Sequence, residues 1–288
     1  MAKVLIVGCG DLGGEVAKQL SILGIETLGL RRSKEAIDGV TIIQADVTQP
    51  SSLSLLIAIN PEVLIYCVAA NGQTDVQYKT HYVDGLHNVL ATQTNNLKLK
   101  HVFFVSSTRV YGQKTDLLLN EQTLAKPSDF GGERLLEAEN LLSKLLNDSQ
   151  KLVNTTILRL SGIYGPGRLR MINLARSPEK WPTQDSWTNR IHRDDAAAFM
   201  VFLTQQVLAD AAIKACYIVT DSKPSSQYEV LTWIANKMQI KIESNPPPIE
   251  DGKRLSNQAM LDSSFSLRYP DYASGYQALL AEINTSQN

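Results

Sequence analysis

The fold class can be inferred from the stretch VLIVGCGDLGGEVAKQL (Val4–Leu20). A short apolar, β-branched run passes directly into glycines and then into a helical pattern, so a strand, a turn and a helix are predicted. The glycines have the spacing G-x-G-x-x-G, in which the first allows a tight turn, the second lets the backbone approach a pyrophosphate, and the third lets the helix pack on the strand. The helix N-terminus adds free N–H groups for phosphate. The predicted phosphate-binding residues are Gly8, Gly10, Asp11, Leu12 and Gly13.

Further along the chain, apolar runs alternate with helical patterns. The predicted strands are Lys3–Val7, Glu26–Leu30, Thr41–Ala45, Val63–Ala69, His101–Ser106 and Thr156–Leu160. The predicted helices between them are Leu12–Leu23, Ser51–Ile59, Asp75–Thr94 and Ser128–Leu146. This alternation is typical of an α/β fold with a Rossmann-type, doubly wound parallel sheet, whose right-handed crossovers place helices on both faces.

The regular alternation ends after Gly165, where a loop-rich stretch with Gly, Pro and Trp begins. We therefore expect residues 1–164 to form the nucleotide-binding core and residues 165–288 to form a smaller, C-terminal substrate lobe. A helix is predicted at Arg193–Gln206, a strand at 216–220 that returns to the core sheet, and helices at Ser226–Met238 and Ser274–Ile283.

Composition excludes several classes of function. The chain has 288 residues, of which 43% are hydrophobic and 20% charged, with a formal net charge of −1. The charge balance argues against nucleic acid as a partner, and no apolar run is long enough for a membrane span. Three scattered cysteines suggest neither a disulfide framework nor a metal site, and we expect free thiols in the cytoplasm.

The residues after the second predicted strand bear on cofactor choice. NAD sites usually carry an acid there that binds the ribose 2′-hydroxyl, whereas this chain has Arg31 and Arg32. A guanidinium pairs with a phosphate through two parallel hydrogen bonds, so NADP is favoured over NAD. Two alternatives remain: the arginines are solvated surface residues, or Glu35 reaches the ribose instead.

Residues at the ends of the third and fourth strands are candidates for the rest of the dinucleotide. Asp46 is placed to accept from an adenine amino group, with Val47 contributing its backbone, although Asp46 also suits the cap of a turn. Ala69 and Ala70 are small enough for the backbone to approach the cofactor closely.

Four motifs resemble the NAD-dependent epimerase/dehydratase family of the extended short-chain dehydrogenase/reductase superfamily. They are ADVT, VSSTRVYG (Val105–Gly112), LRLSGIYGPGR (Leu158–Arg168) and NRIHRDDAAAFMVFL (Asn189–Leu203), and the likeness spans nearly the whole chain. The resemblance implies that Ser107 bonds the substrate oxygen. It also implies a Tyr-x-x-x-Lys pair on the next helix, whose tyrosine is the acid/base and whose lysine assists it and binds the cofactor ribose.

That pair is missing. In PSDFGGERLLEAE (Pro127–Glu139), Phe130 stands at the tyrosine position and Arg134 at the lysine position. None of the ten tyrosines has lysine four residues later; the nearest match is Tyr164 with Arg168. The glycine spacing also departs from the G-x-x-G-x-x-G usual in the extended group, so the chain resembles the atypical branch of the superfamily.

Other residues are candidates for the missing proton transfer and for substrate binding. Tyr111, four residues after Ser107, is the first candidate acid/base and His192 the second, while structural roles for both stay open. Arg134 keeps the positive charge needed to hold a ribose. The predicted substrate-binding residues are Thr108, Tyr164, Arg168, Arg190 and His192.

Two functions remain open from the sequence. One is an enzyme that acts on a small molecule, a sugar nucleotide or a similar polar alcohol. The other is a catalytically impaired NADP(H)-binding sensor or regulatory module. Because lookalikes often dimerise through the helices at Asp75–Thr94 and Ser128–Leu146, a homodimer is a further expectation.

Overall fold

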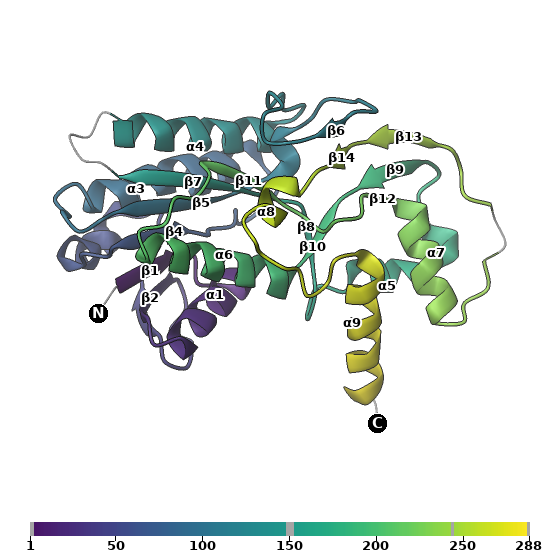
Figure 1. Cartoon of the computed structure of the whole chain (residues 1–288), viewed down its shortest axis with the longest axis horizontal. Helices are drawn as coiled ribbons and strands as arrows, with labels where there is room; N and C mark the ends of the chain where they lie inside the picture. Colours follow the sequence, from purple (N-terminus) through teal and green to yellow (C-terminus); the bar gives the residue numbers. More distant parts are fainter. Residues whose placement is uncertain (1–2, 148–152, 243–244, 287–288) are drawn as a thin grey trace. The chain divides into compact units, whose positions relative to one another are not determined.

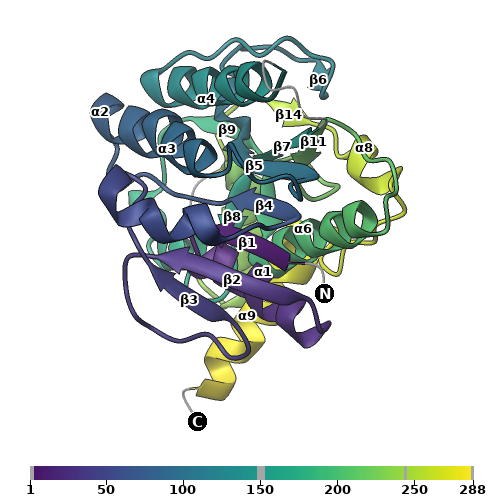
Figure 2. The same ribbon diagram turned by 90° about the vertical axis from the view of Figure 1, so that its left-hand side faces the viewer.

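A computed structural model of the chain describes residues 3–147, 153–242 and 245–286. Its centre is a seven-stranded sheet in the order β11-β7-β5-β4-β1-β2-β3 (Figures 1 and 2). The strands are β1 (Lys3–Val7), β2 (Glu26–Arg31), β3 (Thr41–Gln44), β4 (Val63–Tyr66), β5 (His101–Ser107), β7 (Asn154–Leu160) and β11 (Cys216–Val219). The pairs from β3 to β5 are parallel. This order, with the first strand in the middle and crossovers to both sides, is that of a Rossmann fold.

Helices cover both faces of the sheet. Figures 1 and 2 show α3 (Gly85–Thr92) and α4 (Phe130–Asn147) on one face, and α1 (Asp11–Ile22) and α6 (Arg193–Leu208) on the other. Side chains from Val4 to Val7 in β1 are completely buried, as are all four residues of β4. Strands covered on both sides need continuous apolar runs, which explains why VLIV and VLIY form the centre.

The segment from residue 75 to residue 92 is helical throughout but not uniform. It passes from α2 (Asp75–Tyr78) through a π-helical turn, η2 (Lys79–Asp84), into α3. The hydroxyl of Tyr66, fully buried in β4, donates to the carbonyl of His81 inside this turn. A π-turn widens the helix and frees a carbonyl for such a partner, and these turns are frequent at functional sites.

By internal contacts the chain divides into two compact units whose sequences interleave. Unit 1 contains residues 1–112, 124–159 and 197–217, and unit 2 contains residues 113–123, 160–196 and 218–288. Unit 2 has its own core, in which α5 (Arg170–Ala175), α7 (Gln227–Lys237) and α9 (Tyr272–Ser286) enclose side chains such as Ile172, Ile234 and Tyr276. The units do not separate at one position of the chain, and the boundary expected after residue 164 remains a prediction.

Most predicted elements agree with the structure to within two residues, with a few informative differences. The segment predicted as a helix at Ser51–Ile59 is a 3₁₀ helix, η1 (Pro50–Ala58), that starts on a proline. Strand β4 ends at Tyr66, three residues earlier than predicted, so Ala69 and Ala70 lie outside the ladder. Short strands such as β9 (Asp185–Thr188) were not predicted because two to four residues carry too little pattern. In the described part of the chain, no helix has the length and apolar character required to cross a membrane.

Candidate functional site

The glycine loop has the geometry of a phosphate cradle. Gly8 has φ of +94°, and a Cβ at this position would lie 2.5 Å from the Cys67 carbonyl oxygen. A Cβ at Gly13 would overlap the Gly8 carbonyl oxygen, so the helix packs directly on the turn. Gly10 differs, because nothing lies within 4 Å of the place that a Cβ would take. The loop is thus closed at Gly8 and Gly13 and left open at Gly10, which fits a pyrophosphate at the N-terminus of α1.

The remaining predicted residues of this loop differ in exposure. Asp11, the first residue of α1, is exposed, whereas Leu12 is buried against the core. A backbone contribution from both is compatible with this arrangement.

The two arginines at the end of β2 have different environments. The Arg31 guanidinium forms an ion pair with Glu35, four residues later, whereas the Arg32 side chain is exposed. The Glu35 carboxylate therefore competes for the guanidinium that was predicted to bind a 2′-phosphate.

Asp46 stabilises a turn. Its Oδ1 atom accepts from the Thr48 backbone N–H at 2.9 Å and from the Thr48 hydroxyl at 2.8 Å. Partial burial acts to raise the pKa of Asp46, but the hydrogen bonds from Thr48 and the nearby Arg32 charge lower it overall. Val47 is buried, and its carbonyl accepts from the Asn88 amide at 2.9 Å.

The two alanines after β4 differ in exposure, because Ala69 is exposed and Ala70 is half-buried. The backbone N–H of Ala70 is hydrogen-bonded to the Tyr82 hydroxyl, and burial raises the pKa of Tyr82 to about 12.

Phe130 opens α4 and packs against a cation. Its ring meets the Tyr78 ring edge-on, with centroids 5.5 Å apart, and the Arg109 guanidinium carbon lies 5.2 Å from each ring centroid. Asp129 accepts from Arg109 Nε at 2.8 Å and from the Gly132 backbone N–H at 2.9 Å. The same carboxylate therefore binds the Arg109 guanidinium and caps the N-terminus of α4. The position at which the superfamily has tyrosine is here one wall of an arginine site.

Arg134 is held by carboxylates. Its Nε and Nη2 atoms donate to the two oxygens of Asp75 at 2.7 and 3.0 Å, and its Nη1 atom donates to Glu137 at 2.7 Å. The hydrogen bonds from Arg134 are the largest cause that lowers the pKa of Asp75, and the charges of Arg134 and Lys79 lower it further. A ribose would have to compete with Asp75 for Arg134.

Tyr111 belongs to a buried charged network. It is 0% exposed, and its hydroxyl accepts from Arg159 Nη1 at 2.6 Å. Arg159 is paired with Glu139 at 2.6 Å, and Glu139 also accepts from the Ser106 hydroxyl at 2.6 Å. Such a satisfied network joins β5, α4 and β7, so the burial of Tyr111 argues for a structural role.

Ser107 and Thr108, the predicted site residues that precede Tyr111, differ in exposure. Ser107 is half-buried, and its hydroxyl accepts from the Arg109 backbone N–H at 3.2 Å. Thr108 is buried in the 3₁₀ turn that follows, η3 (Thr108–Val110).

Unit 2 brings three of the predicted substrate residues together in its interior. Tyr164 and His192 have ring centroids 5.2 Å apart and are both buried, as is Arg190. Burial, more than any other cause, lowers the pKa of His192, and its Nδ1 atom accepts from the Asp194 backbone N–H at 3.2 Å. Arg168, in contrast, has an exposed side chain.

Three buried polar atoms in this region have no hydrogen-bond partner among the described residues: Tyr164 Oη, Arg190 Nη1 and Asp221 Oδ2. Burial raises the pKa of Asp221 to about 7, against the lowering effect of Arg190. Buried polar atoms normally find partners, so this cluster is a place where water or a polar ligand satisfies them.

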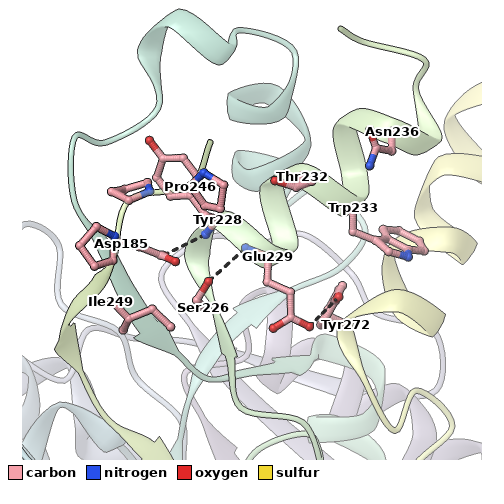
Figure 3. A pocket seen from close by; sticks show the side chains of 12 residues that line it. Asp185, Ser226, Tyr228, Glu229, Thr232, Trp233, Asn236, Pro246, Ile249 and Tyr272 are labelled. Carbon is pink, nitrogen blue, oxygen red and sulfur yellow. Dashed lines mark hydrogen bonds between the residues drawn. The ribbon is translucent and has the colours of Figure 1, made fainter. Parts of the chain in front are cut away.

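A cavity of about 570 Å³ in unit 2 was not predicted from the sequence (Figure 3). It lies between α7 and the proline segment Pro246–Pro248, where Asp185 accepts from the Tyr228 backbone N–H at 3.0 Å and Tyr272 donates to Glu229 at 3.0 Å. A proline-rich segment predicts a loop, and nothing in the sequence indicates that this loop lines a cavity.

Arg109 and Tyr78 were also missed by the sequence analysis. The only available signal was the pair Gly131–Gly132 in the first turn of α4, where glycine disfavours a helix and therefore requires a packing reason. That reason is Arg109: a Cβ at Gly131 would collide with its guanidinium, and one at Gly132 would lie 2.5 Å from its carbonyl oxygen.

Comparison with known proteins gives the family. Residues 4–215 match the NAD dependent epimerase/dehydratase family. The chain belongs to this family. The matched residues include the glycine loop and the strands from β2 to β7, and the family's description names NAD.

Three proteins are similar to this chain over nearly its whole length, to different degrees. A solved structure from Methylobacillus flagellatus, titled as a NAD-dependent epimerase/dehydratase, is 47% identical, with a TM-score of 0.88, over 98% of this chain and 99% of that one. Protein YeeZ of Escherichia coli K12 is 24% identical over 94% of this chain and 97% of its own length. MoeE5 in complex with UDP-glucose and NAD is 18% identical and shares the fold, with a TM-score of 0.80 over the full length of both chains.

Proposed function

We propose that this family member binds a nicotinamide dinucleotide and acts on a sugar nucleotide or a similar polar alcohol. The observation that carries the proposal is the glycine loop, which is closed by Gly8 and Gly13 and left open at Gly10. The proposal is also supported by the family to which the chain belongs and by MoeE5, a protein of the same fold in complex with UDP-glucose and NAD. The unpartnered buried polar atoms of unit 2 suit a substrate rich in hydroxyl groups.

NADP is the proposed cofactor. Arg31 ends β2 and Arg32 follows it, and a 2′-phosphate would replace Glu35 as the partner of the Arg31 guanidinium. NAD has no phosphate with which to compete for that ion pair.

The chain's own residues have separate proposed roles. When bound, the nicotinamide supplies hydride transfer. Ser107 orients the substrate oxygen from the end of β5, and Arg134 binds the cofactor ribose after it releases Asp75. Tyr111 and His192 remain sequence-based candidates for proton transfer, although the Tyr111 hydroxyl is enclosed and bonded to Arg159.

The test is a titration of the purified protein with NADPH and NADH. UDP-glucose is then added to the protein loaded with NADP+, and the absorbance of the reduced nicotinamide that forms when a sugar hydroxyl gives up its hydride is measured. We expect NADPH to bind more tightly than NADH, and Ser107→Ala to abolish any turnover without changing NADPH affinity. An undetectable affinity for both cofactors would overturn the proposal.

One observation favours a second function, a cofactor-binding regulatory module. Phe130 has no proton to transfer, and it is packed against Arg109 rather than left open to a substrate. Turnover that appears only after Phe130→Tyr with Arg134→Lys, in a protein whose wild type binds NADPH, would select this function over the enzyme.

We also propose that the protein is cytoplasmic and forms a homodimer. Among the described residues, Cys9, Cys67 and Cys216 form no disulfide with one another, which suits the reducing cytoplasm. A homodimer is tested by sedimentation of the purified protein.

A further inference from the structure

Two hydrogen-bond donors in unit 1 converge on a single oxygen atom. The Tyr78 hydroxyl and Arg109 Nη1 each donate to Gln73 Oε1 at 3.1 Å, and Arg109 Nη1 also lies 2.8 Å from the Tyr78 oxygen. Because a guanidinium has donors only, the atom that it faces must be the amide oxygen and not the amide nitrogen. The arrangement is therefore a two-donor site for an oxygen that is bonded to an sp² carbon.

The donors are fixed from several sides. Asp129 holds Arg109 through Nε, which leaves Nη1 for the Gln73 oxygen. The rings of Tyr78 and Phe130 flank the guanidinium, and the missing side chain of Gly131 gives it room. Donors held in place before a ligand arrives stabilise a developing negative charge without reorganisation.

The acceptor is held less firmly than the donors. Gln73 is exposed and lies in the irregular segment between β4 and α2, directly after Gly72 with φ of +147°. Tyr78, in contrast, is only 7% exposed. The Gln73 carbonyl oxygen stands in for the oxygen of a ketone, an aldehyde or a carboxylate.

The site lies at the carboxyl ends of two adjacent strands. Arg109 follows β5 by two residues, and Gln73 comes from the segment that follows β4. The Tyr78 ring also packs against the Tyr82 ring at an interplanar angle of 51°, with centroids 5.2 Å apart, and the Tyr82 hydroxyl is hydrogen-bonded to the backbone of Ala70. Open α/β sheets bind their ligands in the crevice at the carboxyl ends of the strands.

We propose that Tyr78 and Arg109 bind and polarise a carbonyl or carboxylate oxygen of the substrate, and that Gln73 occupies this site until the substrate displaces it. The inference rests on the proposed function and adds a substrate-binding pair to it. Phe130 and Gly131 then serve the arginine, so the altered helix start has a binding role of its own.

Acetate is the probe, because it offers the required oxygen and needs neither cofactor nor sugar nucleotide. Binding is followed by the backbone amide signals of Gly131 and Gly132 in two-dimensional NMR. An internal occupant weakens the apparent affinity by the fraction of time for which it leaves the site free, so Gln73→Ala is expected to bind acetate about tenfold more tightly than wild type. Arg109→Gln is expected to abolish saturable binding.

The control is Gln205→Ala, which removes an exposed glutamine from α6 and is expected to behave as wild type. If Arg109→Gln fails to fold, Tyr78→Phe replaces it; that variant keeps the ring contacts, and loss of one hydrogen bond should weaken acetate binding by about fivefold. Equal affinities in Gln73→Ala and wild type, retained saturable binding in Arg109→Gln, or no acetate binding by Gln73→Ala would each overturn the inference. Since acetate binding is independent of NADPH, a negative cofactor titration would reject the proposed function and leave this result intact.

Discussion

The glycine loop before α1 and the glycine pair at the start of α4 use the same residue type in opposite ways. At the first, a Cβ at Gly8 or Gly13 would collide with backbone atoms, whereas the space beside Gly10 is empty. At the second, Gly131 and Gly132 make room for Arg109, a residue of the same chain. The first site is shaped for a group from outside, whereas the second is filled by the chain itself. A substitution should therefore act through rigid backbone at Gly13 and through a movable side chain at Gly131.

The largest effect is expected at Gly13. In Gly13→Ala the new methyl group meets the Gly8 carbonyl oxygen, which cannot move without distorting the turn. We expect a loss of about 3 kcal/mol in the free energy of unfolding and at least a tenfold loss of NADPH affinity, because one hydrogen bond to a charged group contributes about 1.5 kcal/mol or more. Chemical denaturation and a cofactor titration measure the two effects.

Gly10→Ala is the matched control for Gly13→Ala. Its methyl group enters open space, so the free energy of unfolding should change by no more than about 0.5 kcal/mol, while NADPH affinity should still fall because the backbone is no longer accessible. Equal stabilities of the two variants would show that the loop is not closed as described.

Arg31→Ala should have the next largest effect, and only on one cofactor. Loss of a guanidinium–phosphate interaction costs about 2 kcal/mol, so NADPH affinity should fall by more than about tenfold, whereas NADH, which lacks the phosphate, should be nearly unaffected. Glu35→Gln should have the opposite sign, because it releases Arg31 from its ion pair. Equal losses for the two cofactors in Arg31→Ala would remove the basis for preferring NADP.

Gly131→Ala tests the second site, at the start of α4, where Arg109 fills the space beside the glycine. The new methyl group would collide with the Arg109 guanidinium, which is the far end of a flexible side chain, so we expect a loss of only about 1 kcal/mol in unfolding free energy. In an Arg109→Ala background the collision is absent, and the same change should stabilise the protein by up to about 1 kcal/mol, since alanine favours a helix more than glycine does. A double-mutant cycle measures this change of sign, and additive effects would exclude the contact.

The sequence was informative where one segment determines its own structure. The strand at Val63, the helix near Ser128 and the bend at Gly8 were all predicted, because buried β-branched runs, helical periodicity and a glycine spacing are local signals. The match to the epimerase/dehydratase family confirms the fold and the recognised family.

The site around Arg109 was beyond prediction because its parts are far apart in the chain. Gln73 and Arg109 are separated by 36 residues, and Tyr78 and Arg109 by 31. In VSSTRVYG the arginine resembles any polar residue in a turn, and no periodicity marks it. Likewise, Asp75 gave no sign of binding Arg134 across 59 residues of sequence. Side-chain pairs of this kind depend on how the segments after β4 and β5 pack with α2 and α4.

The smallest effect is expected from Asp75→Asn. This substitution tests whether Arg134, near the start of α4, can bind a ligand once the Asp75 carboxylate is removed. The hydrogen bond from Arg134 keeps the pKa of Asp75 below its ordinary value, so at neutral pH the carboxylate is charged and the ion pair intact. The asparagine lacks this charge, and Arg134 would then be available to a ribose, so NADPH affinity should rise by about threefold while the melting temperature stays close to that of wild type. Asp210→Asn, which removes another exposed carboxylate paired with a cation, Lys100, is the control and should leave NADPH affinity unchanged. An unchanged or lower affinity in Asp75→Asn would mean that Arg134 does not bind the cofactor, and its role would then be limited to joining α2 to α4.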